Sequence, residues 1–315
     1  MYSVLLQIGI VLLLSPFINT FMKKLKANLQ GRQGPPFLQG YYDLLKYFRK
    51  ETVVSEQASW LFGITPSIVF ASTLVASLII PTFFHLPLMN TLGGIILLVY
   101  LFALGRFFMV SAAMEPGSGF AGMAGSREMM LAVLIEPTFL LSLFVFALMA
   151  GSSNLSSIMS WLSMKPPMIL SPSYLVALFA LFIACLAEVG RVPFDNPETH
   201  YELTMIHEGM LLEYSGKPLG LMIWSAWVKQ LILLSLIAGF IPPWQMTDLI
   251  SLPNMPLVVG VYLLKLLFLC LCIVLIETTN AKVRLFRVQD LLGIGFVLAV
   301  IALILNVHTV SGGPS

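Results

Sequence analysis

Charged residues are scarce in this sequence. Of its 315 residues only 10% are Asp, Glu, Lys or Arg, whereas 58% are hydrophobic and the mean hydropathy is +0.93. Soluble domains carry about 25% charged residues, so the composition excludes a soluble globular chain. Apolar runs of about 20 residues, each long enough to cross the hydrocarbon core, recur along the chain. We therefore expect one all-α integral membrane domain over residues 1–315, in contact with a lipid bilayer and not with nucleic acid.

Cysteine is equally scarce, and this limits the cofactors that the chain could hold. The three cysteines, Cys185, Cys270 and Cys272, all lie in apolar runs. A disulfide framework is not implied, and an iron–sulfur cluster usually needs four thiolates. His200 and His207 are separated by six residues, which matches no strong metal-ligand spacing. The expectation is that this chain binds no metal or prosthetic group itself.

Hydropathy runs bounded by charge, proline and glycine predict eight transmembrane helices. Their expected ranges are 3–22, 62–84, 91–113, 128–150, 173–192, 219–241, 255–277 and 290–308.

The distribution of lysine and arginine predicts the orientation of these spans. If the N-terminus is outside, 13 of the 17 basic residues fall in or at the edge of the inside loops, and only Lys165 falls in an outside loop. Positive loops stay in the cytoplasm, so we expect a multi-pass protein with its N-terminus outside. The inside loops are 23–61, 114–127, 193–218 and 278–289.

The loop 23–61 has a pattern of its own. Aromatic and leucine residues recur at helical spacing over 40–54, with Lys46, Arg49 and Lys50 among them. This predicts a short amphipathic helix, which either lies in the membrane interface or packs on the cytoplasmic side of the domain. The glycines and prolines of 31–36 predict a turn before it.

A few ionisable residues lie inside the predicted spans, where burial of a charge is costly and a function is the default hypothesis. Glu136 should lie about 12 Å below the cytoplasmic edge of its span, and Arg106 at a similar depth, so we expect the two to be neighbours. Lys229 and Lys265 should lie near mid-membrane. Each of these groups serves either structural pairing or an ion path.

The segment 188–216 concentrates acidic residues. It holds six of the fifteen carboxylates in the chain, interleaved with apolar residues that make it too hydrophobic to extend freely into water. A solvated loop and a cation site are the alternatives, but an ion-conducting polar cluster beneath a soluble partner fits the pattern best. The six are Glu188, Asp195, Glu198, Glu202, Glu208 and Glu213.

Three motifs carry a family resemblance. The segments EVGRVPFDNPETHYEL and LLEYSG, GRQGPP in the first inside loop, and GSRE followed by LIEP are similar to the NuoH-type membrane subunit of respiratory complex I. They resemble still more the membrane subunits of group 4 nickel–iron hydrogenases of the formate hydrogenlyase and hydrogenase-4 type. The similarity extends over nearly the whole chain, including its length and its eight spans.

The resemblance implies a subunit at the heel of a membrane arm, beneath a hydrophilic electron-transfer module, in a bacterial or archaeal cytoplasmic (inner) membrane. Its partners would be the hydrogenase large and small subunits, which with an iron–sulfur subunit would hold the nickel–iron centre and the iron–sulfur clusters, and antiporter-like membrane subunits. The acids Glu136, Glu188, Asp195, Glu198, Glu202 and Glu213 would form an ion path. Arg32, Gly34 and Pro35 of the turn 31–36 would border a chamber facing the partner.

Two departures from the complex I pattern select between the family's branches. His200 stands where that pattern usually has glutamate, and the stretch TMIHEGMLLEYSG is longer than its counterpart. Both favour a hydrogenase-type complex, which can work without a quinone. The alternative is the quinone-site subunit of a complex I-type NADH:quinone oxidoreductase. A stand-alone transporter is a third possibility, but the chain shows no internal repeat of the kind common in transporters.

Overall fold

The computed structural model describes residues 2–81, 94–164, 171–195, 205–242, 255–281, 283 and 285–311. The regular elements of this part of the chain are ten α-helices and one short 3-10 helix. The α-helices are α1 (Tyr2–Leu29), α2 (Gln39–Arg49), α3 (Trp60–Ile79), α5 (Ile95–Met114), α6 (Gly119–Ala150), α7 (Leu155–Met164), α8 (Pro172–Glu188), α9 (Gly216–Phe240), α10 (Met255–Thr279) and α11 (Leu285–Ser311), and the 3-10 helix is η2 (Glu208–Leu211).

Eight of these helices correspond to the eight predicted spans. Seven are long and apolar enough to cross a membrane, namely α1, α3, α5, α6, α9, α10 and α11. The eighth, α8, is a shorter apolar helix of 17 residues, at the lower end of the length that a span needs. The predicted class, an all-α multi-pass membrane protein, is confirmed. The orientation of the N-terminus stays a prediction.

Helix α6 departs most from the predicted boundaries. It begins at Gly119, nine residues before the predicted start at 128, so much of the expected loop 114–127 is helical. Small residues explain the extension, because they let neighbouring elements approach closely. A Cβ on Gly209 of η2 would lie 2.6 Å from the Cβ of Ala124, and one on Gly125 would lie 3.3 Å from Val110 of α5. Tertiary packing thus overrides the low helix propensity of glycine.

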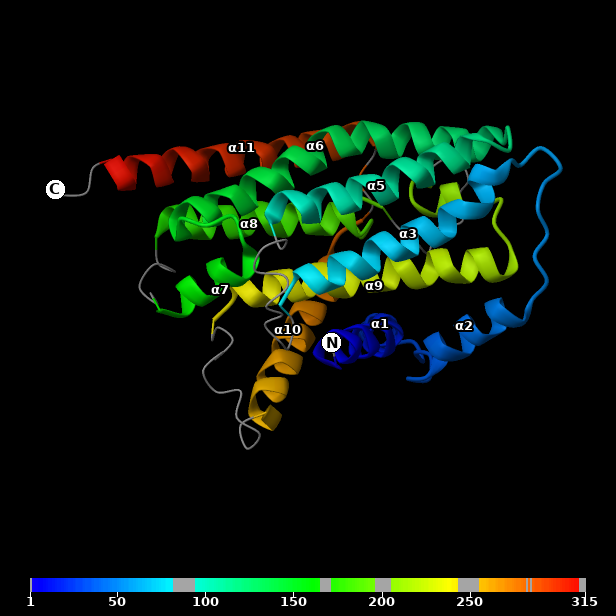
Figure 1. Cartoon of the computed structure of the whole chain (residues 1–315), viewed down its shortest axis with the longest axis horizontal. Coiled ribbons are helices and arrows are strands. Elements are labelled where there is room, and N and C mark those ends of the chain that lie inside the picture. Colours follow the sequence, from blue (N-terminus) through cyan, green and yellow to red (C-terminus); the bar gives the residue numbers. More distant parts are fainter. Residues whose placement is uncertain are drawn as a thin grey trace.

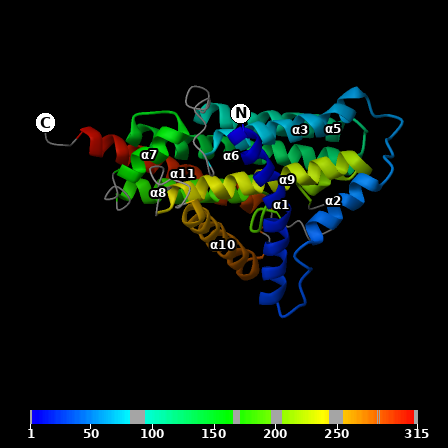
Figure 2. The same ribbon diagram turned by 60° about the horizontal axis from the view of Figure 1, so that its bottom comes forward.

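The spans form a bundle with a common direction and two crossing members. Figure 1 shows α3, α5, α6, α8, α9 and α11 running along the long axis of the molecule, while Figure 2 shows α1 and α10 crossing that direction. Helix α6 packs against α5, α8 and α11, and α9 packs against α3 and α1. One large apolar core joins the eight spans.

Three prolines lie inside spans, Pro16, Pro66 and Pro137, and at the first two a side chain from elsewhere in the chain satisfies the backbone carbonyl that the proline releases. Proline has no N–H, so the carbonyl four residues earlier loses its partner, which is costly in an apolar bundle. For Pro16 of α1 that carbonyl belongs to Leu12, and it accepts a hydrogen bond from the Trp224 indole of α9 at 3.3 Å. The indole therefore ties α9 to the point where α1 is interrupted.

The carbonyl released by Pro66 of α3 also finds a hydrogen-bond donor elsewhere in the chain. The carbonyl of Phe62 accepts the hydroxyl of Tyr214 at 3.0 Å, and the two rings stack with centroids 4.0 Å apart. Tyr214 lies just before α9, so this contact fixes the entry of α9 into the bundle. Such satisfied carbonyls explain why α1 persists through Pro16 and α3 through Pro66.

Helix α2 is the predicted amphipathic helix. It packs on α1 and α9 through its buried residues Gly40 and Leu44, while Tyr42 and Leu45 are exposed. The junction with α9 is close, because Gly216 has a φ of +55° and a Cβ there would lie 2.5 Å from the carbonyl oxygen of Glu51. Helix α2 thus lies against the end of the bundle at which α9 begins.

Candidate functional site

The centre of the site is the guanidinium of Arg106, on α5 inside the bundle. It contacts three carboxylates, those of Glu128 and Glu136 on α6 and of Glu188 on α8. The Nε atom of Arg106 lies 3.1 Å from Oε1 of Glu128, and each of the other two carboxylates takes one terminal nitrogen. The side chains of Arg106, Glu128 and Glu188 are buried, whereas that of Glu136 is 39% exposed. The predicted proximity of Arg106 and Glu136 is confirmed.

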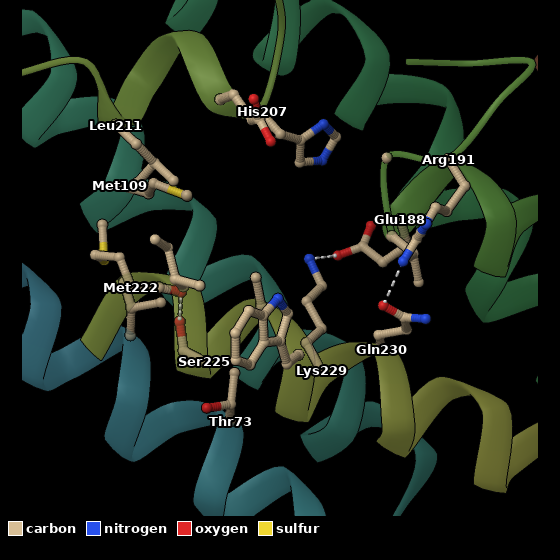
Figure 3. Close-up of a pocket in the computed structure, with 18 of the residues that line it drawn as sticks. Thr73, Met109, Glu188, Arg191, His207, Leu211, Met222, Ser225, Lys229 and Gln230 are labelled. Atoms are coloured by element: carbon tan, nitrogen blue, oxygen red, sulfur yellow. Dashed lines mark hydrogen bonds and ion pairs between the residues drawn. The ribbon is translucent and has the colours of Figure 1, made fainter. Parts of the chain in front are cut away.

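Helix α9 adds a second cation to this network. The Nζ atom of Lys229 lies 2.6 Å from Oε1 of Glu188, as the dashed line in Figure 3 marks. The same ammonium lies 5.6 Å from the centre of the Phe102 ring, within the range of a cation–π contact. Glu188 thus lies between the cations of α5 and α9, and Glu136 is the most exposed of the three carboxylates that contact Arg106.

His207 closes the network from the side of η2. Its Nε2 atom lies 3.5 Å from Oε2 of Glu128, and its Nδ1 atom lies 3.7 Å from Oδ2 of Asp195. Burial alone would lower the pKa of His207, and Lys229 lowers it further, but Glu128 and Asp195 outweigh both and raise that pKa above its ordinary value. The imidazole is therefore favoured in its protonated form between two carboxylates.

A second buried polar group lies beside the first. Arg191 contacts the carboxylate of Glu277 on α10 at 3.1 Å and the amide oxygens of Asn19 on α1 and Gln230 on α9. The Nζ atom of Lys26 lies 3.5 Å from the other oxygen of Glu277. Because Gln230 follows Lys229 directly in the sequence, the two groups meet along α9.

A cavity of about 230 Å³ separates the charged network from an apolar wall. The network borders it through Arg106, Glu188 and Lys229, and Figure 3 shows the His207 ring and the Lys229 ammonium on its charged side. The apolar part of the wall consists of side chains from α3, α5 and α9, namely Val69, Phe102, Met109, Met222 and Trp227. One water molecule occupies roughly 30 Å³ of liquid, so this space could hold several.

The structure brings together six of the predicted site residues. These are Arg106, Glu136, Glu188, Asp195, His207 and Lys229. Glu208 also borders the cavity, whereas Glu213 is half-buried beside Tyr214 and does not line it. Glu198, His200 and Glu202 lie outside the described residues.

Four other predicted residues lie apart from the network. Arg32 is exposed, and neither Gly34 nor Pro35 lines the cavity, so their place at a partner interface stays a prediction. Lys265 of α10 donates hydrogen bonds to the carbonyl oxygens of Ala238 and Ile241 at 3.1 and 2.7 Å. Those carbonyls end α9, so Lys265 is placed to satisfy a helix C-terminus.

Sequence reasoning did not select Glu128, Lys26, Arg191 or Glu277 as site residues. Glu128 had a detectable signal, since it lies eight residues before Glu136 and so on roughly the same side of one helix. The contact between Arg191 and Glu277 spans 86 residues and had no such signal. Among the described residues, no group of three or more His, Cys, Asp or Glu side chains could hold a metal ion.

Comparison with known proteins gives a consistent family and fold. The family model described as NADH dehydrogenase matches residues 2–309. Hydrogenase-4 component C of Escherichia coli (strain K12) is 34% identical, with 95% of this chain and 93% of the relative covered. Formate hydrogenlyase subunit 4 of the same organism is 33% identical, with 95% and 96% covered.

More distant similarities extend to another branch. A subunit of the NADH-quinone oxidoreductase of Rhodospirillum centenum (strain ATCC 51521 / SW) is 28% identical, with 87% of this chain and 81% of the relative covered. A chain in the structure of the membrane-bound sulfane sulfur reductase, an archaeal respiratory membrane complex, matches with a TM-score of 0.80 and 19% identity, covering 96% of this chain and 99% of that chain. At this identity the match shows a shared fold.

The geometry predicts a severe effect of removing the central cation. Arg106→Met leaves the buried carboxylates of Glu128 and Glu188 without their shared partner, and breaking such a buried pair costs about 3–5 kcal/mol. We expect a lower melting temperature of the purified protein in detergent. Adding Glu188→Gln should recover part of the loss.

The matched control is Arg32→Met, which removes an exposed guanidinium. An Arg106→Met protein that melts at the temperature of the Arg32→Met protein would contradict the central role of Arg106 in the network.

Proposed function

Because the chain belongs to the NADH dehydrogenase family, we propose that it is the membrane-anchor and energy-coupling subunit of a multisubunit membrane-bound nickel–iron hydrogenase. In this proposal the chain links electron transfer in a hydrophilic module to the movement of protons or sodium ions. The nickel–iron centre and the iron–sulfur clusters belong to partner subunits, namely the large, small and iron–sulfur subunits. Antiporter-like membrane subunits continue the ion path beyond this chain. The complex lies in a cytoplasmic membrane, with the N-terminus of this chain outside.

The hydrogenase branch is supported by the similarity to two membrane subunits of that kind. Their names are hydrogenase-4 component C and formate hydrogenlyase subunit 4, and both are covered over more than nine-tenths of their length. The relatives of the quinone-reducing branch are less similar, at 28% identity or below among those compared.

The observation that carries the coupling role is the buried charge network around Arg106. It contains more ionisable groups than the packing of α5, α6, α8 and α9 requires, because apolar residues of similar volume would stabilise the bundle at least as well. Two charges about 4 Å apart interact by about 4 kcal/mol at an effective dielectric constant of 20. A proton gained or lost at Glu188 is therefore felt strongly at Arg106, Lys229 and Glu136.

Such coupling can transmit a change of charge from one end of the network to the other. A redox change in the partner would alter the charge at the end where His207 and Asp195 lie, and the response passes through Glu128 and Arg106 to Glu136 and Glu188. Each carboxylate can take and release a proton as its neighbours change charge. Glu198 and Glu202 continue this acidic series in the sequence.

The proposal predicts that carboxylates of the network are required for ion translocation. With the complex in lipid vesicles, Glu136→Gln and Glu188→Gln should each lower the ions moved per hydrogenase turnover at least about tenfold, because an amide cannot carry a proton. Turnover is measured with a soluble dye as electron donor, so the ratio corrects for the amount of assembled complex. The control is Glu56→Gln, at an exposed position. Full translocation per turnover in both variants would show that the path lies elsewhere.

A second candidate function follows from the cavity. Its apolar wall faces the Lys229 ammonium and the His207 imidazole, an arrangement that suits a flat molecule with a polar end. This is the site that a quinone-site subunit of a complex I-type NADH:quinone oxidoreductase would offer.

A photoreactive quinone analogue distinguishes the two functions. If the chain serves a quinone reductase, the analogue should label peptides of α3 and α9, and unlabelled quinone should compete. The hydrogenase assignment predicts no competed label on these peptides. Peptides of α10 serve as the internal control, since α10 contributes no residue to the cavity wall.

A further inference from the structure

The imidazole of His207 lies between two carboxylates that belong to different parts of the fold. Asp195 follows α8, Glu128 belongs to α6, and each faces its own ring nitrogen of His207. The residue directly precedes η2, its side chain is 23% exposed, and it borders the cavity. Figure 3 shows the ring on the charged side, opposite Met109 and Thr73. No other described histidine reaches the network, because His308 lies at the far end of α11.

Three further contacts hold this ring in place. The Oδ2 atom of Asp195 accepts the backbone N–H of Ile206 at 3.3 Å and that of His207 at 3.2 Å. Gly190 has a φ of +67°, and a Cβ there would lie 2.6 Å from Nδ1 of His207. The ring therefore packs on the backbone of Gly190, where a side chain would exclude it. Such close packing fixes both nitrogens relative to their carboxylates.

The charges around His207 favour a bound proton. The groups that face it are Glu128 on α6, Asp195 and Glu188 at the end of α8, Lys229 on α9, and Arg106 on α5 behind Glu128. With Glu136, the network holds four carboxylates and two basic side chains, Arg106 and Lys229. A protonated imidazole reduces this excess of negative charge, in keeping with the raised pKa of His207.

We propose that His207 is a proton-transfer residue that connects Asp195 with the buried network through Glu128. The proposal rests on the coupling function proposed above and names the group through which protons enter or leave that network. It assigns a role to one residue of TMIHEGMLLEYSG, the stretch that we expect to be longer than its complex I counterpart.

The transfer balances as an exchange of one proton. The protonated imidazole gives its Nε2 proton to the carboxylate of Glu128, which becomes a carboxylic acid, and the neutral ring keeps its proton on Nδ1. Exchange with solvent moves that proton to Nε2. The carboxylic acid of Asp195 then gives its proton to Nδ1, so Asp195 ends as a carboxylate and the protonated imidazole is restored. The separations of 3.5 and 3.7 Å exceed a hydrogen bond, so each step needs a bridging water or a small movement of the side chain.

Chemical rescue tests this proposal in the intact complex in lipid vesicles. His207→Ala should lower the ions moved per hydrogenase turnover at least about tenfold, and free imidazole in the medium should restore a large part of the loss. His207→Arg keeps a positive charge but does not exchange a proton, so it should stay low with and without imidazole. His308→Ala, which removes an exposed imidazole, should behave as the unaltered chain. If His207→Ala does not assemble, His207→Gln takes its place, with low translocation expected.

The outcomes separate this inference from the proposed function. Normal translocation in His207→Ala or His207→Gln would overturn the inference. Normal translocation in His207→Arg would also overturn it, because it would show that only the positive charge of His207 is needed. A His207→Ala defect that imidazole does not relieve also counts against it. In each of these cases a loss in Glu136→Gln and Glu188→Gln would leave the coupling function standing. If those two variants translocate normally, the coupling function itself fails.

Discussion

The ion pairs of one buried guanidinium organise this bundle. Arg106 lies inside a largely apolar bundle, and its charge is tolerable there because Glu128, Glu136 and Glu188 surround it. These partners belong to α6 and α8, so the need to neutralise one cation brings three helices to one point. Lys229 adds α9 through Glu188. The cavity, the position of η2 and the contact with His207 all depend on this convergence.

The elements around the network are held with little freedom. Trp224 and Tyr214 donate to carbonyls released by prolines, so α9 is anchored to α1 and α3 by hydrogen bonds that an apolar bundle cannot replace. Gly190 lets the imidazole of His207 lie against the backbone. A rigid frame around groups that can change charge is what energy coupling requires, because a loose frame would dissipate the effect of a proton in local motion.

Much of this could be predicted from the sequence, since hydropathy reports directly on burial in a membrane. The eight spans, the amphipathic helix after the first span, and the pairing of Arg106 with Glu136 all follow from spacing and depth. The predicted start of α6 at position 128 was wrong. Close packing against η2 outweighs the low helix propensity of the glycines before that position. The contacts of Arg191 join segments that are far apart, and no local pattern encodes them.

The central claim is that buried carboxylates of this network change protonation during turnover of the complex. Infrared difference spectroscopy of the intact complex, comparing turnover with rest in ordinary and heavy water, measures this directly. The account predicts a band of a protonated carboxyl group that shifts in heavy water and disappears in Glu188→Gln or Glu136→Gln. A spectrum without any carboxyl band, or one whose band persists unchanged in both variants, would contradict it.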